Sequence, residues 1–595
     1  MDYDRIPSLT HLFFDQANAL AGKNLTYWRS NGSWVPATWA ETAAQIRALA
    51  TFLISQGVAP GDRIGLVAEN RPEWLIADLA IMAAGAITVP AFSTNTSEDH
   101  RHILTHSGAK GVIHSGGAIG ARLMPAALQA PELKFTIAID AQDKTAQMPF
   151  RQIAWHEAVG TAIDETALAE RLLAQKRGDT CCIIYTSGTG GTPKGVMLSH
   201  GSILCNIKGA YRLLLDVGLG DDRFLSFLPL SHSYEHTAGQ FLPISIGAEI
   251  WYAESVEKLV DNMAEARPTI MTAVPRLYEA MHTKILRGLT KAPPLRQKLF
   301  WLAYRLGRKA YENPGSLGLG ETLLNKLCDI LVRKKVRGRF GGHLKAFVSG
   351  GAALNYEIGI FFLALGVRLL QGYGQTEASP VISANMPSKI KIDTVGPIFD
   401  GLTARIAEDG EILVKGEAVM NGYWRDPDAS AKAVVDGWLH TGDIGEFDSD
   451  GYLKITDRKK DIIVLSGGDN VSPARVEGFL VLQTEIAQAM VHGDKHPHLV
   501  ALIVPDEEFA RDWAAKNGGG DLATLADNPA FHKALGPVID RVNSSLSPIE
   551  KIRRYTLLPE GFTIDNGMLT PSLKIKRHKI RDRWGASIAK MYERG

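Results

Sequence analysis

The sequence is poor in cysteine and has no cysteine spacing that would build a metal or disulfide framework. Only four cysteines occur in 595 residues, and no two of them form a Cys-x-x-Cys pair. A structural zinc site and a disulfide-stabilised secreted fold are therefore disfavoured. A reducing setting follows, and we expect the protein to be cytoplasmic.

Long apolar runs are also missing. No uncharged stretch reaches the ~18 residues that a membrane-spanning helix requires. The two best candidates, residues 74–92 and 358–370, are interrupted by Asp78 and Arg368. The first residues, MDYDRIPSL, are acidic and lack the basic-then-apolar order of a signal peptide. The sequence therefore predicts neither a spanning helix nor a secretory leader.

Net charge is only +1, but it is unevenly distributed along the chain. Residues 282–345 contain 15 Lys or Arg against 3 acidic residues, a local charge of +12 that leaves −11 elsewhere. Within this segment, leucines recur at spacings typical of one face of a helix: Leu295, Leu299, Leu302 and Leu306. Two interpretations remain open: a surface helix with solvated charges, or a peripheral contact with anionic lipid on the inner face of the membrane. No nucleic-acid-reading module accompanies the charge, so we expect no nucleic-acid partner, and nothing indicates an oligomeric state.

The hydrophobic fraction of 45% and the charged fraction of 22% are ordinary for a globular protein, and the length implies more than one domain. Apolar strand-like runs alternate with helical stretches between about residues 40 and 400. This alternation predicts an α/β fold with mostly parallel sheets covered by helices, whose ligands bind beyond the carboxyl ends of the strands. The runs are 64–68, 86–90, 111–114, 136–139, 181–185, 224–228, 270–273, 346–349 and 367–371.

The texture of the sequence changes after residue 400. Residues 402–457 contain short strands and turns, which indicates a small β subdomain. After the run DRKK, further strands at 488–492 and 499–505 and a basic tail indicate a separate α+β domain. We therefore predict an N-terminal domain over residues 1–460 and a C-terminal domain over residues 461–595, with the boundary at Lys460.

A Gly-rich loop in CCIIYTSGTGGTPKGVMLSH, residues 181–200, is the first candidate binding element. Residues 181–185 read as a buried strand, residues 186–192 are all small, and Lys194 follows. Free backbone N–H groups, hydroxyls and one ammonium form a cradle for polyphosphate. A Walker A loop does not fit, because Pro193 stands at its second glycine position and Gly195 follows the lysine. The alternative is a Gly-rich hairpin turn, although such turns are usually two to five residues long.

Three later motifs complete a nucleotide site. In LLQGYGQTEASP, residues 369–380, Tyr373 offers an aromatic face for a base, Thr376 a hydroxyl, and Glu377 the hard oxygen that Mg²⁺ prefers. In WLHTGDIG, residues 438–445, the Asp443 carboxylate can accept both hydroxyls of a ribose, and Arg458 follows in TDRKKD. Alone, Asp443 is equally an ordinary turn cap and Tyr373 an ordinary core residue, so the combination carries the prediction.

In this order and spacing the motifs resemble those of the AMP-forming, adenylate-forming enzymes, over nearly the whole chain. Within that superfamily the chain is similar to the long-chain fatty acyl-CoA synthetases. The signals are LPLSHSYEHTAG (228–239), VSGGAALNYEI (348–358), RKKDIIVLSGGDNVSP (458–473), GMLTPSLKIKR (567–577) and the basic insertion. The resemblance implies a large N-terminal domain with a small mobile lid and two half-reactions. A fatty acid and ATP give acyl-AMP and pyrophosphate with Mg²⁺, and coenzyme A then displaces AMP.

The resemblance also implies residue roles. Lys574 would bridge the carboxylate and the α-phosphate, His232 would lie near the carboxylate, Glu377 and Thr189 would serve Mg²⁺, and Lys460 would be the hinge. Gly467 and Gly468 would admit the pantetheine arm in the thioester step. The remaining nucleotide contacts would come from Thr186, Ser187, Gly188, Thr189, Lys194, Gly350, Gly351, Ala352, Gln371, Gly372, Tyr373, Gly374, Thr376, Asp443 and Arg458.

One departure from the family pattern keeps alternatives open. Gly190 stands where the family loop usually carries a second hydroxyl, so weaker ATP binding or a non-catalytic nucleotide- or lipid-binding relative is conceivable. A ligase that loads another carboxylic acid onto coenzyme A or a carrier protein is the other alternative. Against amino-acid substrates, His232 replaces the acidic residue expected for an amino group. The apolar stretch 233–253, which an ordinary core would equally explain, predicts a fatty-acid tunnel between the sheet and the insertion. The region after His232 would control access, and no chain length is specified.

Overall fold

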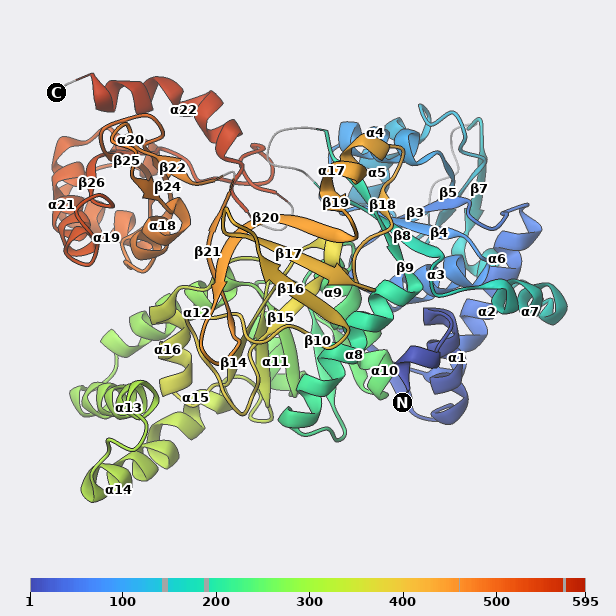
Figure 1. Ribbon diagram of the computed structural model, residues 1–595, viewed down its shortest axis with the longest axis horizontal. Helices are drawn as coiled ribbons and strands as arrows, with labels where there is room; N and C mark the ends of the chain where they lie inside the picture. The colour runs from blue at the N-terminus through green and yellow to red at the C-terminus, as the bar shows by residue number, and fades with distance from the viewer. Residues whose placement is uncertain (1, 142–147, 187–191, 460, 571–573, 594–595) are drawn as a thin grey trace.

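The computed structural model describes residues 2–141, 148–186, 192–459, 461–570 and 574–593, and it is a mixed α/β protein (Figure 1). A large N-terminal part is built on two eight-stranded sheets and a five-stranded one, and a smaller C-terminal part has a sheet of its own. All nine strands expected before residue 400 are present, so the predicted α/β class is confirmed.

The first sheet has the strand order β18-β9-β8-β4-β3-β5-β6-β7 and is parallel from β8 through β7. Its strands are β3 Arg63–Val67, β4 Ile87–Pro90, β5 Ala109–His114, β6 Phe135–Ala138, β7 Arg151–Ala154, β8 Thr180–Thr186, β9 Lys194–Ser199 and β18 Gly422–Tyr423. Strands β8 and β9 pair antiparallel, with Thr186 opposite Lys194. The Gly-rich segment therefore connects two neighbouring antiparallel strands, as a strand–loop–strand arrangement requires. Residues 187–191 lie outside the described part of the chain.

The second sheet has the order β15-β14-β13-β12-β10-β11-β1-β2, with antiparallel pairs at its two edges. Its strands are β1 Asn24–Ser30, β2 Ser33–Thr38, β10 Arg223–Ser226, β11 Glu249–Tyr252, β12 Ile270–Ala273, β13 Ala346–Ser349, β14 Leu369–Gly374 and β15 Val381–Ala384. Strand β14 runs three residues beyond its predicted end. Pairing with β15 places Gly372 opposite Ala384 and Tyr373 opposite Ser383, so the aromatic motif belongs to the strand itself.

Helices cover both sheets, and the largest core lies between them. Ser199 caps α8, because its side chain accepts a hydrogen bond from the Ser202 backbone N–H. The helices before residue 275 are α1 Leu9–Ala19, α2 Trp39–Ser55, α3 Pro72–Ala83, α4 Ser97–Ser107, α5 Gly117–Ala127, α6 Trp155–Val159, α7 Glu165–Ala174, α8 His200–Val217, α9 Ser233–Glu235, the π-helix η2 His236–Phe241, α10 Leu242–Ile246 and α11 Leu259–Ala266. Helix α3 is buried on all sides in this core, which explains its apolar sequence without a membrane. Within the described residues, no helix combines the length and the apolar character needed to cross a membrane.

The basic segment forms helices, as expected. It comprises the end of α12 Pro275–Thr290, then α13 Pro294–Glu312, α14 Leu319–Cys328, the π-helix η3 Asp329–Arg333 and α15 Lys334–Gly338; α16 Tyr356–Ala364 follows. In Figure 1, α13 and α14 project at the lower left, away from the sheets. Leu306 is buried against Cys328, but Leu295 is 68% exposed, so the leucine stripe is only partly a core stripe.

Two further units follow in the chain. A five-stranded sheet contains β16 Leu402–Ile406, β17 Glu411–Gly416, β19 Val434–Val435, β20 Trp438–Phe447 and β21 Leu453–Arg458, beside α17 Pro427–Ala433. Beyond it, β24 Ile486–His492, β25 Leu499–Pro505 and β26 Ile552–Leu557 form a sheet with its own apolar core. The short pair β22 Ile463–Val464 and β23 Asn470–Val471 precedes them, with helices α18 Pro473–Val481, α19 Glu507–Asn517, α20 Leu522–Ala526, α21 Pro529–Ser544 and α22 Arg577–Tyr592.

The acidic residue that interrupts the apolar run of α3 is a buried anchor. The Asp78 Oδ2 atom accepts hydrogen bonds from His236 Nε2 and Gln240 Nε2, both at 2.8 Å, and all three side chains are inaccessible to solvent. Helix α3 is thereby tied to the π-helix η2, which follows directly on the motif containing His232.

We expect Asp78→Ala to lower the free energy of unfolding of the N-terminal part by about 3 kcal/mol, because two buried donors lose their acceptor. Denaturant unfolding followed by tryptophan fluorescence measures the change. Glu165→Ala, which removes an exposed partner of Arg47, is the control and should change stability by about 0–1 kcal/mol. Equal losses in the two variants would show that the buried anchor contributes nothing special.

Candidate active site

A single large cavity, about 3100 Å³ in volume, lies beyond the carboxyl ends of β10, β12, β13 and β14 and extends to the C-terminal part. A pocket for one small ligand is usually about 300–1,000 Å³, so several substrates can occupy this one. Most predicted site residues line it: Thr186, His232, Gly350, Gly351, Ala352, Gln371, Gly372, Tyr373, Gly374, Thr376, Glu377, Asp443, Arg458 and Lys574.

Some predicted residues are not in the cavity wall. Gly467 and Gly468 lie in an exposed turn between β22 and β23, and among the described residues neither lines the cavity. Lys194 lies just outside the lining, at the start of β9. Ser187, Gly188 and Thr189, together with the predicted hinge residue Lys460, lie outside the described residues.

One corner of the cavity joins β14 to the five-stranded sheet. The Tyr373 hydroxyl donates a hydrogen bond of 2.7 Å to Asp443 Oδ2. Arg458 faces Asp443 across the β20–β21 ladder, with Nε 3.6 Å from Oδ1. Burial raises the pKa of Asp443, and the Tyr373 hydrogen bond and Arg458 oppose this rise. A carboxylate has about four acceptor positions, so Asp443 retains capacity for the hydroxyls of a ribose.

A second link connects the Thr376 motif with the motif around His232. Ser233 Oγ and Thr376 Oγ1 are 2.9 Å apart and both side chains are buried. The His232 Nδ1 atom accepts a hydrogen bond of 3.2 Å from the Tyr234 backbone N–H, which leaves the proton of a neutral ring on Nε2. Burial lowers the pKa of His232 to about 4, and Lys574 contributes to the lowering. Near pH 7 the ring is therefore a neutral donor within the cavity.

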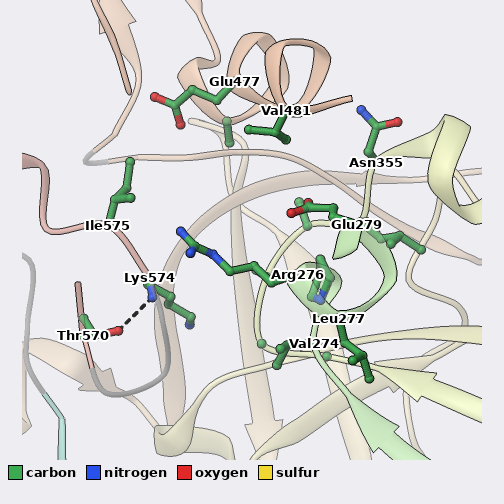
Figure 2. A pocket seen from close by; sticks show the side chains of 18 of the residues that line it. Val274, Arg276, Leu277, Glu279, Asn355, Glu477, Val481, Thr570, Lys574 and Ile575 are labelled. Atoms are coloured by element: carbon green, nitrogen blue, oxygen red, sulfur yellow. Dashed lines mark hydrogen bonds between the residues drawn. The ribbon is translucent and has the colours of Figure 1, made fainter. Parts of the chain in front are cut away.

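Lys574 reaches the cavity from the C-terminal part. Its backbone N–H donates a hydrogen bond of 3.0 Å to Thr570 Oγ1, which is drawn in Figure 2. Enclosure by the cavity walls lowers the pKa of the Lys574 ammonium; Arg458 lowers it further, whereas Asp443 and Glu377 raise it. The ammonium is thus close enough to both carboxylates to feel their charge, and a bound anion would stabilise its charged form.

Two residues predicted to contact the nucleotide, Gln371 and Gly350, instead stabilise the packing of the cavity wall. Gln371 Oε1 accepts from the Leu354 backbone N–H at 3.2 Å, and its Nε2 donates to the Thr394 carbonyl at 3.1 Å. The Gln371 side chain therefore holds the loop after β13 instead of pointing freely at a ligand. A Cβ atom at Gly350 would lie 3.0 Å from the Tyr234 ring, so this glycine lets the loop pack closely on the motif that contains His232.

Comparison with known proteins agrees with this geometry. The model of the AMP-binding enzyme family matches residues 13–424, and that of the AMP-binding enzyme C-terminal domain matches residues 460–595. The long-chain-fatty-acid–CoA ligase FadD15 of Mycobacterium bovis is 35% identical over 95% of this chain and 93% of that protein. Long-chain-fatty-acid–CoA ligase 1 of Homo sapiens is 30% identical over 93% of this chain and 82% of that protein.

The chain belongs to the AMP-binding enzymes, in the family of the long-chain fatty-acid–CoA ligases. Solved structures show the same fold at lower identity. The adenylation domain of a carboxylic acid reductase from Segniliparus rugosus, in complex with AMP and a carboxylic acid, has a TM-score of 0.77 at 19% identity, over 99% of this chain and 94% of that one. O-succinylbenzoate coenzyme A synthetase from Bacillus subtilis, in complex with ATP and magnesium, has a TM-score of 0.67 at 20% identity, over 96% of this chain and 99% of that one.

Sequence reasoning missed Tyr423, which connects two predicted site residues of this AMP-binding enzyme. Its hydroxyl donates a hydrogen bond of 2.9 Å to Glu377 Oε1, and its ring centroid lies 4.9 Å from Lys194 Nζ. The Lys194 ammonium also lies 3.8 Å from Asp426 Oδ2. Strand β18, which carries Tyr423, pairs with β9, which carries Lys194. No local motif announces this link, because β18 crosses from the later part of the chain to an earlier sheet.

Arg276 was also missed. It stands at the start of α12 and points across the cavity toward Lys574 and Glu477 (Figure 2). Burial lowers the pKa of its guanidinium, and it forms no salt bridge with any carboxylate of the described chain. Glu477, in contrast, accepts two hydrogen bonds from Arg577, at 2.7 and 2.6 Å. The run VPRLYE contains Arg276, but a single arginine after a strand does not distinguish a ligand contact from a surface residue.

Within the described residues, no group of three or more His, Cys, Asp or Glu side chains could hold a metal ion by itself. Glu377 is the predicted Mg²⁺ ligand that the structure describes, and its Oε1 already accepts the Tyr423 hydrogen bond. A second carboxylate oxygen remains for a cation that completes its coordination with phosphate oxygens and water.

We expect Tyr423→Phe to lower kcat/KM for MgATP by roughly tenfold, because Glu377 loses a charge-assisted hydrogen bond. The loss should appear as a higher KM for MgATP and a higher Mg²⁺ requirement in a pyrophosphate-release assay. Tyr452→Phe removes a hydroxyl that donates to the Lys389 carbonyl outside the cavity, and it should leave both values unchanged. An unchanged Mg²⁺ requirement in Tyr423→Phe would rule out the positioning role.

Proposed function

We propose that the protein joins a long-chain fatty acid to coenzyme A in two steps at this cavity. In the first, the fatty-acid carboxylate attacks the α-phosphorus of ATP, forming acyl-AMP and releasing pyrophosphate. In the second, the thiol of coenzyme A attacks the acyl carbon and AMP departs. The observation that carries the proposal is the convergence of Tyr373, Asp443, Glu377 and Lys574, from separate parts of the chain, on one cavity whose wall also contains many apolar side chains.

The first step joins two anions, and the residues present suit that task. Asp443 and Arg458 would hold the ribose, and Tyr373 would lie against the adenine. Thr376 and Lys574 would contact the α-phosphate, while neutral His232 would donate to the fatty-acid carboxylate. Mg²⁺, held by Glu377 and ATP oxygens, would offset phosphate charge. Preorganised contacts of this kind contribute on the order of 3–4 kcal/mol each to stabilisation of the transition state.

The loop at 185–195 completes the phosphate site in this proposal. Thr186, Ser187, Gly188, Thr189 and Lys194 would hold the β- and γ-phosphates, with Thr189 beside Mg²⁺. Gly350, Gly351, Ala352, Gln371, Gly372 and Gly374 would form the wall beneath the adenine and the acyl group. The hairpin of β8 and β9 supports this assignment, because it places Thr186 and Lys194 opposite each other at the base of the loop.

Apolar side chains in the cavity wall support a long acyl chain. They come from α8, β10, η2, α10 and β12, among them Leu213, Leu214, Phe224, Ala238, Leu242 and Ile270. His232 lines the same cavity, so an acyl chain whose carboxylate it holds would lie against apolar side chains of this wall. Each methylene transferred from water into such a surrounding contributes about 0.8 kcal/mol.

We therefore expect kcat/KM to rise at least about tenfold from octanoate to palmitate, since eight further methylenes are buried. The assay measures pyrophosphate release with ATP and a panel of acids, and acyl-CoA formation with free coenzyme A. Equal values for the two acids would contradict a long-chain site. Pyrophosphate release without acyl-CoA would favour a carrier-protein acceptor, and no release with any acid would favour a non-catalytic nucleotide-binding protein.

We propose that the C-terminal part, residues 461–595, is a mobile lid that turns about Lys460 between the two steps. Lys574 faces the cavity, whereas the turn with Gly467 and Gly468 is exposed outside it. One placement of the lid thus presents only one of the two elements. A rotation would withdraw Lys574 and bring the glycine turn in, where bare backbone admits the slim pantetheine arm.

We expect Lys574→Ala to abolish acyl-AMP formation and still convert supplied acyl-AMP and coenzyme A into acyl-CoA. Gly468→Leu should do the reverse, releasing pyrophosphate and accumulating acyl-AMP. Both half-reactions are followed separately by chromatography. Lys590→Ala controls for loss of a cation in the C-terminal tail. Gly451→Leu controls for a side chain at a glycine with positive φ, since Gly451 has φ 77° and Gly468 φ 89°. Equal loss of both half-reactions in folded Lys574→Ala would exclude the alternation.

We also propose that the protein acts in the cytoplasm and contacts anionic lipid at the inner face of the membrane. The +12 charge of residues 282–345 supports such a contact. Several of these cations are neutralised within the fold: Arg287, Arg308, Lys309, Arg337 and Lys345 form salt bridges with carboxylates. Any attraction to lipid therefore depends on the remaining cations and on the surface around them.

A further inference from the structure

Exposed apolar side chains concentrate on the projecting hairpin of α13, α14 and η3. Leu319 is 94% exposed, Leu323 72%, Ile330 63% and Leu327 47%. Leu295 and Trp301 on α13 are exposed as well. Single exposed leucines are normal on a protein surface, but a cluster on one element marks a site of interaction.

The four residues Leu319, Leu323, Leu327 and Ile330, called here the outer leucine face, have helical spacing. Steps of four, four and three residues place them on one side of α14 and its continuation η3. The other side of the same helix already packs inward, where Cys328 is 2% exposed and contacts the buried Ala303 and Leu306 of α13. Helix α14 therefore has a core side and a second apolar side that the fold leaves uncovered.

Exposed cations lie on the same helix and on its two neighbours in the chain. Lys326, Lys334 and Lys335 are exposed on α14 and α15, and Arg296, Lys298 and Arg305 are exposed on α13. None of these six forms a salt bridge with a carboxylate in the described ranges, whereas Lys309 of α13 and Arg337 of α15 do. The outer leucine face is thus an apolar strip with a positive rim.

We propose that the outer leucine face inserts into the interface of an anionic lipid bilayer, with the surrounding cations at the headgroups. This inference rests on the proposed membrane contact and changes its mechanism from charge attraction alone to apolar insertion. An apolar strip with Lys and Arg beside it is the pattern of helices that lie in the plane of a membrane. Charge complementarity favours anionic lipid over a second copy of this chain. If two copies paired through their outer leucine faces, the cations beside each face would be brought close to one another and would repel.

The location of the hairpin connects the bilayer with the cavity. One side of α12 lines the cavity from Leu277 through Lys284 to Gly288, and the hairpin begins six residues later at Pro294. A bilayer on the outer leucine face would therefore contact the hairpin that follows this cavity-lining helix in the chain. Fatty acids partition into bilayers, so docking here would place the substrate reservoir beside the enzyme.

Vesicle co-sedimentation of the full chain tests the proposal. The apolar variant is Leu319→Asp with Leu323→Asp, and the charge variant is Lys326→Gln with Lys334→Gln. Leu173→Asp is the control, because Leu173 is 82% exposed on α7, outside the hairpin. Vesicles of phosphatidylcholine alone and of phosphatidylcholine with phosphatidylglycerol are compared at low and high salt.

We expect the apolar variant to bind anionic vesicles about tenfold more weakly than the wild type at either salt concentration. The charge variant should lose mainly the salt-sensitive preference for anionic vesicles. Leu173→Asp should match the wild type. All variants should keep wild-type kcat/KM for octanoate, which is presented in water, and the apolar variant should be slower with palmitate embedded in vesicles.

Unchanged vesicle binding by the apolar variant would overturn the proposal. So would a wild-type dimer in light scattering that the apolar variant converts to a monomer, since a second copy would then cover this face. A wild type that binds neither kind of vesicle would overturn both this inference and the proposed membrane contact. Acyl-CoA formation from octanoate would remain as independent support for the enzymatic function.

Discussion

The hydrogen bond from Tyr373 to Asp443 joins the two structural parts on which the site depends. Tyr373 belongs to β14 of the second sheet, and Asp443 belongs to β20 of the five-stranded sheet. Arg458 stands opposite Asp443, and the chain enters the C-terminal part just beyond it. This contact positions β20 beside β14, and β21, paired with β20, leads into the C-terminal part that carries Lys574. The position of Asp443 in the cavity and the direction from which Lys574 reaches it thus depend on the same contact.

Burial and charge then divide the work among the side chains. Burial keeps His232 neutral with a pKa of about 4, so it can donate to an anion without adding charge. Enclosure and the charge of Arg458 lower the pKa of the Lys574 ammonium. A bound anion would stabilise its charged form. Tyr423 donates a hydrogen bond to Glu377 and lies beside Lys194, so it connects the predicted Mg²⁺ ligand with the lysine of the predicted phosphate loop. Neutral His232 and the Lys574 ammonium are both suited to the negative charge that the proposed substrates carry.

The hairpin of α13 and α14 shows how a local charge total can mislead. The +12 of residues 282–345 predicts an electrostatic surface, yet six of its cations form salt bridges within the fold. Helix α14 exposes Leu319, Leu323 and Leu327, which lie outside the leucine spacing of residues 295–306. Arg287 also binds Asp506 and Glu508 of the C-terminal part, so this segment serves the contact between the two parts as well as the surface.

Local patterns in the sequence determined the elements and the composition of the site. The apolar runs became strands within a few residues, Ser199 capped its helix, and the motifs around Tyr373 and Asp443 supplied residues that do meet in one cavity. These are short-range properties, in which neighbouring residues determine period, caps and turns. Tertiary structure alone decided the partners of β18, and hence the role of Tyr423, and the burial of Asp78 beneath the motif of His232. It also assigned Gln371 to the wall and Gly468 to the outside. Such outcomes depend on which distant segments pack together, and no local period or motif encodes that choice.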